Sequence, residues 1–272
     1  MMEINESATG GSKVAQKQAL IGGVVTGASA EMIEYMRQDF LDTTRERLQL
    51  FEQSLSEGAD LDSLRYFAFE VKGQARNFGM PLMGIIAARL EDYLNALDQM
   101  SEWSAAGINA FLDTLRSAID GGITDNADPS LIVRGLPARP RLLGVDDNDV
   151  LDVEVMLVME HASQSNFVER EMQACGYRTT IVSSPFEAFE SVIRTRPDMV
   201  IVSAVLPGLS GIDLATALAT MPETRNTPVA VLTSLDDDNA NLNLLPKSVP
   251  VIHKGESFGD DLAKALSHHF LL

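Results

Sequence analysis

A short strand and the turn that follows it are encoded by residues 197–211, which read PDMVIVSAVLPGLSG. The aliphatic run from Met199 to Val202 is typical of a strand that is covered on both faces of a sheet. The Pro207-Gly208 pair after it predicts a turn. The stretch therefore predicts a buried strand that ends in a tight loop.

The same alternation of a short aliphatic run and a helical segment recurs from residue 155 to the end of the chain. Strands are expected at Val155 to Met159, Thr179 to Val182, Met199 to Val202, Val229 to Leu232 and Val249 to Ile252. Helices are expected at Asn166 to Ala174, Pro185 to Ile193, Ile212 to Thr220, Asp236 to Leu244 and Phe258 to Leu266. This alternation predicts an α/β domain with a doubly wound, five-stranded parallel sheet over residues 155–272.

The first half of the chain follows a helical period instead. The mainly apolar positions advance by three and four residues along four segments. These segments run from about 29 to 56, from 61 to 78, from 82 to 97 and from 108 to 119. Short loops between amphipathic helices predict an antiparallel four-helix bundle over residues 28–123. Residues 1–27 are expected to be flexible, and residues 124–154, which lose periodicity and collect acids, are expected to form an acidic linker.

Charge and cysteine content restrict the class of partner. The chain has 39 acidic and 21 basic residues, a formal net charge of -18, which disfavours binding to nucleic acid or to an anionic membrane. Cys175 is the single cysteine, so an intramolecular disulfide or a thiolate metal cluster is excluded. The first residues carry no apolar run of the secretory type. We expect a cytoplasmic protein that binds other proteins.

An exposed stripe is predicted on the second helix. Arg65, Phe69, Lys72 and Arg76 follow one another at spacings of four, three and four, opposite the apolar positions of that helix. Gly73 lies among them and weakens a helix unless another backbone approaches closely. One interpretation is a partner-binding face centred on Phe69. The alternative is that Phe69 only widens the contact of the helix with the core.

The residues around Phe69 resemble a known motif. The run FEVKGQA at 69–75, followed by Asn77-Phe78-Gly79, is similar to the motif of histidine-phosphotransfer (HPt) domains, His-x-Leu-Lys-Gly-Ser with a glycine-bounded turn after it. In this resemblance, Phe69 occupies the position of the phosphorylated histidine. Phenylalanine has no nucleophilic atom, and the first histidine of the chain is His161. The resemblance implies a degenerate HPt-like domain.

The second half resembles CheY-like receiver domains, which have a flavodoxin-like fold. In that family an aspartate after the third strand accepts the phosphoryl group, an acidic pair after the first strand holds Mg²⁺, and a threonine and a lysine contact the product. The resemblance places Ser203 at the phosphoacceptor position, Glu160-His161 at the acidic pair, and Thr233 and Lys254 at the last two positions. It implies a degenerate receiver, because a serine hydroxyl and a single carboxylate are poor substitutes for a carboxylate cluster around Mg²⁺.

A competing alignment places the first strand earlier in the chain. Leu142 to Val145 and the pair Asp146-Asp147 also look like a receiver first strand with its acidic pair. That alignment would stretch the first helix from about Val150 to Ala174, far longer than this fold uses, so we favour Glu160-His161. Neither alignment supplies a phosphoacceptor. No metal, cofactor or catalytic residue is expected.

These features predict a non-catalytic adaptor or antagonist in a bacterial two-component phosphorelay. Its expected partners are a histidine kinase, a response-regulator receiver domain, or both. Two alternatives stay open: a phosphorelay intermediate with an unorthodox acceptor such as Ser203 or His161, and a signalling scaffold. The sequence leaves undecided the oligomeric state, the packing of the two domains on each other, and whether the protein activates or inhibits.

Overall fold

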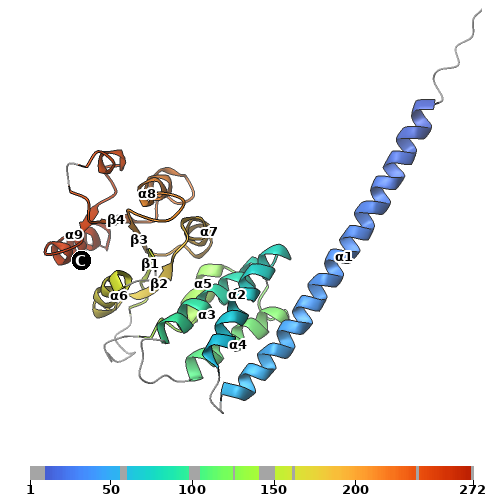
Figure 1. Cartoon of the computed structure of the whole chain (residues 1–272), viewed down its shortest axis with the longest axis horizontal. Helices are drawn as coiled ribbons and strands as arrows, with labels where there is room; N and C mark the ends of the chain where they lie inside the picture. The colour runs from blue at the N-terminus through green and yellow to red at the C-terminus, as the bar shows by residue number, and fades with distance from the viewer. Residues whose placement is uncertain are drawn as a thin grey trace, which may run out of the picture.

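Two modules follow one another along the chain, a helical module and an α/β module (Figure 1). The computed structural model describes residues 10–55, 60–97, 105–124, 126–140, 151–160, 163–236 and 239–270. Residues 141–150, which include Asp146 and Asp147, and His161 lie outside the described part. The helical module contains α1 (Gly10–Leu55), α2 (Leu61–Asn77), α3 (Pro81–Leu97), α4 (Ala105–Ile119) and the short α5 (Pro129–Gly135).

The first four helices form the predicted bundle around one apolar core. The core stripe of α2 consists of Leu64, Phe67, Ala68, Val71 and Ala75, all buried. The helix starts where the Asp60 carboxylate accepts a hydrogen bond from the Asp62 amide at 3.1 Å. It ends at Asn77, and the nearby Gly79, with a φ of 69°, lets the Met80 amide turn back and donate to the Ala75 carbonyl oxygen at 2.8 Å. The predicted four-helix bundle is confirmed.

Helix α1 is longer than the sequence period indicates. It begins at Gly10 and has 46 residues, whereas the expected helix begins near residue 29 after a flexible segment. The residues after Gly11, SKVAQKQAL, are mostly strong helix formers, although their apolar spacing is irregular. Within the described residues, neither α1 nor any other helix is long and apolar enough to cross a membrane.

The segment expected as a linker has structure of its own. Asp128 accepts a hydrogen bond from the Ser130 amide at 2.9 Å and Pro129 starts α5, a combination that fixes a helix start. Leu136, directly after α5, is buried in the core of the bundle. Part of the segment 124–154 therefore packs on the helical module, because α5 and Leu136 bury their apolar side chains there.

The α/β module has a five-stranded parallel sheet in the order β2-β1-β3-β4-β5. The strands are β1 (Glu154–Val158), β2 (Arg178–Val182), β3 (Met199–Ser203), β4 (Val229–Thr233) and β5 (Val251–His253). Each lies within two residues of its predicted position. The order is that of flavodoxin-like folds, so the predicted fold class is confirmed.

Helices cover both faces of this sheet. They are α6 (Ser163–Ala174), α7 (Pro185–Thr195), α8 (Gly211–Thr220) and α9 (Phe258–Phe270). Successive side chains of β1 lie on opposite faces of the sheet. Val155 and Leu157 pack with α6 and α9, and Met156 and Val158 pack with α7 and α8. The two apolar layers explain why the strands read as continuous apolar runs.

The prediction of a helix at Asp236 to Leu244 is wrong. In the described part of that segment, residues 236 and 239–244, the structure has a 3₁₀ turn, η2 (Leu242–Leu244). Asp and Asn side chains there compete with the helix for backbone hydrogen bonds: the Asn239 side-chain oxygen accepts from the Asn241 amide at 3.0 Å. A local turn therefore replaces the helix.

Candidate functional site

The residue at the centre of the predicted partner-binding face is exposed. Phe69 lies on α2 with 58% of its surface open to solvent, on the side of the helix away from the bundle core. Tyr66, one turn earlier on the same side, is 60% exposed. Tyr66 was not predicted as part of this face, although its spacing of three from Phe69 is the signal that places it there. The rings of Tyr66 and Phe69 are therefore both exposed on one side of α2. Phe69 is not part of the core.

Gly73 continues this face toward the end of α2. The residue is exposed, and a Cβ atom added there would have no neighbour within 4 Å. Among the residues that the structure describes, no contact therefore requires glycine at this position. The bare backbone leaves room for a partner beside Phe69. We call the surface formed by Tyr66, Phe69 and Gly73 the α2 face.

The two arginines predicted beside Phe69 point elsewhere. Arg65 donates to the Asp62 carboxylate at 2.6 Å and to the Leu94 carbonyl oxygen of α3 at 3.1 Å. Arg76 forms an ion pair of 2.7 Å with Glu190 of α7. These contacts turn Arg65 toward α3 and Arg76 toward the α/β module. The structure thus separates the two arginines from the exposed ring instead of gathering them around it.

Lys72 links three elements. Its Nζ atom lies 2.6 Å from a Glu91 carboxylate oxygen on α3, 3.4 Å from Glu187 on α7, and 5.7 Å from the centre of the Phe69 ring. Burial of Lys72 opposes its charge, but the hydrogen bond to Glu91 and the nearby Glu187 carboxylate outweigh this effect and raise the pKa of Lys72. Lys72 is therefore charged at neutral pH and ties α2 to α7.

The predicted receiver residues meet at the carboxyl edge of the sheet, where the strands end. Ser203 is the last residue of β3 and Thr233 the last residue of β4, and both are buried. The Lys254 amide, directly after β5, donates to the Thr233 carbonyl oxygen at 2.8 Å. Glu160 follows β1 and is exposed. Parallel strands bring these ends to one edge, so four of the five predicted residues lie there, and His161 falls outside the described residues.

Both hydroxyl groups at this edge are engaged with the backbone. The Ser203 Oγ atom donates to the Val205 carbonyl oxygen at 3.2 Å, and the Thr233 Oγ1 atom accepts from the Leu235 amide at 3.0 Å. Burial lowers the pKa of Lys254. The Ser203 hydroxyl is thus held by a carbonyl group, which does not act as the general base that a serine nucleophile needs.

The described residues at this edge do not fit the Mg²⁺ ion that a receiver fold implies. Mg²⁺ requires several oxygen ligands in octahedral geometry, usually with carboxylates among them. Glu160 is the one carboxylate among the four described residues, and the Lys254 ammonium group carries a like charge to the ion. In the part of the chain that the structure describes, no cluster of three or more His, Cys, Asp or Glu side chains could hold a metal ion.

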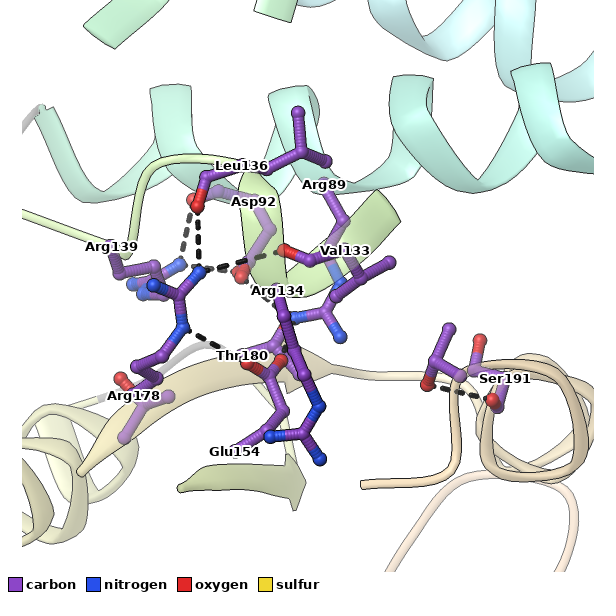
Figure 2. Close-up of polar contacts among 12 residues, drawn as sticks. Arg89, Asp92, Val133, Arg134, Leu136, Arg139, Glu154, Arg178, Thr180 and Ser191 are labelled. Carbon is purple, nitrogen blue, oxygen red and sulfur yellow. Dashed lines mark hydrogen bonds and ion pairs between the residues drawn. The ribbon is translucent and has the colours of Figure 1, made fainter. Parts of the chain in front are cut away.

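A buried ionic network joins the two modules at the open edge of β2 (Figure 2). Asp92 of α3 accepts hydrogen bonds from the Thr180 hydroxyl at 2.9 Å and from the Ile181 amide at 3.3 Å. Arg139 lies between the carboxylates of Asp92 and Glu169, and its side chain is 3% exposed. Burial opposes the charge of Arg139, but the two carboxylates outweigh it and raise its pKa. The helical module thus supplies a carboxylate to the edge strand of the sheet.

A second cluster lies beside the first. Glu154 of β1, with a side chain 4% exposed, pairs with Arg89 of α3 at 2.5 Å and with Arg178 of β2 at 3.5 Å. Arg178 also donates to the Leu136 carbonyl oxygen at 2.6 Å, as Figure 2 shows. Charges buried in this way are stable only while their partners stay in place. The two clusters therefore hold the bundle and the sheet in one relative position.

A cleft of about 450 Å³ opens next to this joint. Its walls are α2 and α3 on one side and β2 with α7 on the other. Lys72 and Arg76 line the first wall, and Glu187 and Glu190 line the second. The cations of the predicted partner-binding face are thus already paired with acidic residues of the same chain.

The helical module matches a known family. The family model described as the Hpt domain matches residues 35–120, which extend from α1 to the residue after α4. Residues 35–120 are an Hpt domain. The α2 face lies on this Hpt domain. No curated protein sequence matches the chain.

Solved receiver domains are similar to the C-terminal part of the chain. The receiver domain of a Pseudomonas aeruginosa sensor histidine kinase is 24% identical, with a TM-score of 0.38, over 43% of this chain and 96% of that chain. The receiver domain of a Syntrophus aciditrophicus signal transduction histidine kinase is 24% identical, with a TM-score of 0.38, over 43% and 89%. That of a Francisella response regulator is 20% identical, with a TM-score of 0.37, over 43% and 96%. The strand order described above shows a flavodoxin-like fold, so the chain joins an Hpt domain to an α/β module of that fold.

Proposed function

We propose that this protein is a non-catalytic adaptor or antagonist in a two-component phosphorelay. It binds a histidine kinase or the receiver domain of a response regulator through the α2 face and carries no phosphoryl group. The observation that carries this proposal is the exposed Phe69 ring at the position where the HPt motif has its histidine. An aromatic ring provides apolar contact area at small entropic cost, but it has no atom that accepts phosphate.

The chemistry of the sheet edge supports the same proposal. Ser203 is buried and hydrogen-bonded to a carbonyl group, and Glu160 is the carboxylate nearest in sequence to the end of β1. A phosphoryl transfer to this edge would lack both the carboxylate acceptor and the metal ligands of a receiver. The proposed receiver-type domain therefore acts as a rigid support for the Hpt domain. Its proposed place of action is the cytoplasm, among protein partners.

The internal ion pairs suggest which part of the Hpt domain a partner meets. Lys72 and Arg76 are paired with Glu187 and Glu190 of α7, whereas Tyr66, Phe69 and Gly73 have exposed surfaces. A partner would bury the two rings without breaking these pairs. The proposed interface is thus mainly apolar and leaves the joint between the modules intact.

Binding tests the α2 face directly. Phe69→Asp places a charge at the centre of the proposed contact, and we expect the affinity for the cognate kinase or receiver to fall by about ten-fold or more. Leu131→Asp is the matched control, because Leu131 is a 69% exposed apolar residue on α5. Both variants should keep the melting temperature of the parent protein. Equal affinities for the parent and Phe69→Asp would contradict the proposed interface.

Phosphoryl labelling tests the absence of relay chemistry. The intact protein is incubated with a phosphorylated kinase, or with acetyl phosphate and Mg²⁺, and the label on the protein is measured. We expect no retained label, and we expect kinase-to-receiver transfer to slow when this protein is added. A label that is retained on Ser203 or on a histidine would support the alternative of an active phosphorelay intermediate.

A further inference from the structure

The cleft between the two modules has the dimensions of a small-molecule site. Its volume of about 450 Å³ falls within the range of roughly 300–1,000 Å³ that ligand pockets have. Ligand pockets also form preferentially where two domains meet, and this cleft lies between α3 on one side and β2 with α7 on the other. None of the three residues of the α2 face lines it. The cleft is therefore a candidate ligand site distinct from that face.

Small residues on α3 leave this space open. The residues of α3 that line the cleft recur at helical spacing, and two of them, Gly84 and Ala88, lie one turn apart. Gly84 has no side chain and Ala88 has a single methyl group, so neither reaches across to β2 or α7. A large side chain at position 88 would therefore occupy part of the cleft.

The inner end of the cleft is apolar. Met156 of β1 and Ile181 of β2 line the cleft and are buried, and Ile85 of α3 lines it as well. At the outer end, the side chain of Arg76 is 63% exposed. A ligand that enters would thus pass a charged rim and place an apolar part against the sheet.

A buried guanidinium group offers an unused hydrogen-bond donor at the cleft. Arg89 lines the cleft, its side chain is 13% exposed, and its Nη1 atom pairs with Glu154 at 2.5 Å (Figure 2). The Arg89 Nη2 atom is buried and has no hydrogen-bond partner among the residues that the structure describes. Buried donors are nearly always hydrogen-bonded, so a buried donor without a partner points to an acceptor from outside the chain.

The charges around Arg89 favour a carboxylate over a phosphate group. The acidic side chains that line the cleft already form ion pairs with lysine or arginine residues of the chain; they are Glu91, Asp92, Glu187 and Glu190. A single carboxylate would add one negative charge opposite Arg89. A doubly charged phosphate group would be repelled more strongly by Asp92 and by Glu154.

We propose that this cleft binds a small organic acid with an apolar body. The carboxylate of the acid accepts a hydrogen bond from the Arg89 Nη2 atom. The apolar body packs on side chains of α3 and of the sheet, namely Ile85, Ala88, Met156 and Ile181. Because such a ligand contacts both modules, its binding stabilises the joint between them. The proposal does not depend on the α2 face, since the ligand binds the chain in the absence of any protein partner.

Titration of the full chain with hydrocinnamate tests the class of ligand. This acid has one carboxylate and one ring, and we expect a single site with a dissociation constant of about 1 mM or lower. The neutral hydrocinnamamide should bind at least about ten-fold more weakly, because it lacks the charge that Arg89 attracts. Phenyl phosphate should also bind more weakly than the acid. No detectable binding of the acid, or an amide or phosphate that binds as tightly, would overturn the proposal.

Two variants test the position of the site. Ala88→Phe fills part of the cleft and should weaken hydrocinnamate binding at least about ten-fold. Ala263→Phe is the matched control, because Ala263 is exposed on α9, across the sheet from α7. Arg89→Lys keeps a cation opposite Glu154 but removes the Nη2 donor, so the preference for the acid over the amide should shrink. Melting temperatures verify that each variant is folded.

Methyl NMR spectra of the parent chain locate the ligand without any substitution. Hydrocinnamate should shift the methyl signals of Ile85 and Met156, and it should leave unchanged that of Met199, whose side chain is buried on the other face of the sheet. Shifts confined to residues outside the cleft, or an affinity unchanged by Ala88→Phe, would contradict the proposed site. An unchanged preference for the acid in Arg89→Lys would refute the role of Arg89.

Discussion

The contact between Asp92 and the edge of the sheet leads to a quantitative prediction. Asp92→Ala removes the carboxylate that accepts from Thr180 and Ile181 and that pairs with Arg139. Arg139 keeps Glu169 and the Asp92 main-chain oxygen, which lies 2.7 Å away. Breaking a buried ion pair costs about 3–5 kcal/mol, and an unsatisfied buried amide costs about 1–3 kcal/mol. Because two partners of Arg139 remain, we expect a total loss of about 3–5 kcal/mol.

Urea denaturation of the full chain measures this loss. Asp92→Asn separates the two contributions, because the amide oxygen can still accept from the strand while the charge is gone, so a smaller loss is expected. Asp62→Ala is the surface control: its carboxylate is 88% exposed in the pair with Arg65, and the loss should stay below about 1 kcal/mol. Asp92→Ala combined with Arg139→Leu should cost less than the sum of the two single changes. A loss for Asp92→Ala no larger than that of the surface control would refute the reasoning.

Further predictions concern single positions. A Cβ atom at residue 211 would lie 1.8 Å from the Ser203 carbonyl oxygen, so Gly211→Ala should destabilise the chain by about 1–3 kcal/mol. Gly73→Ala has open space around the added methyl group and should be neutral or stabilising. Equal urea midpoints for the two variants would contradict this prediction. Hydrogen bonds from the Ser63 hydroxyl and the Asp62 amide hold the pKa of Asp60 below its usual 3.8. The stabilisation of α2 by Asp60 is therefore present above about pH 4 and is lost as the pH falls through the lowered pKa, and Asp60→Asn should flatten that part of a stability-against-pH curve. Partial burial, with Glu171 nearby, raises the pKa of the Cys175 thiol, so its alkylation rate at about pH 7, followed by mass spectrometry, should be lower than that of free cysteine.

The elements of the fold were predictable where a local pattern encodes them. The run from Met199 to Val202 and its four counterparts gave the strands, because a strand covered on both faces must be apolar throughout. The helix at Asp236 to Leu244 failed because side-chain hydrogen bonds of Asn239 replaced helical ones. Local sequence thus predicts an element well when burial and periodicity agree.

The joint between the modules has no comparable signal in the sequence. Arg139 lies in a segment rich in proline and acids, yet its partners Asp92 and Glu169 are 47 and 30 positions away. In the same way, Lys72 and Arg76 look like free cations on a helix, and only the folded chain brings Glu187 and Glu190 beside them. Ion pairs between residues so far apart in the chain produce no periodic pattern in the sequence, so they could not be predicted from it.

At the candidate site, spacing predicted an exposed stripe through Phe69 but left open that Phe69 widens the core contact, and the resemblance to receiver domains placed Ser203 directly after the expected strand from Met199 to Val202. The orientation of Arg65 was not predictable, because the Leu94 carbonyl oxygen that binds it lies on another helix. Residue type and position were therefore predictable, and the direction of long side chains was not.

The buried carboxylate of Asp92 also limits how either module can be exchanged between proteins during evolution. An Hpt domain moved to another protein would carry a buried acid with nothing to neutralise it, and the sheet left behind would expose an unprotected strand that invites self-assembly. A successful exchange would have to move Asp92, Arg139 and Glu169 together, from three separate places in the gene. Evolution of this protein is thus expected to proceed by change within the pair of modules and not by replacement of either one.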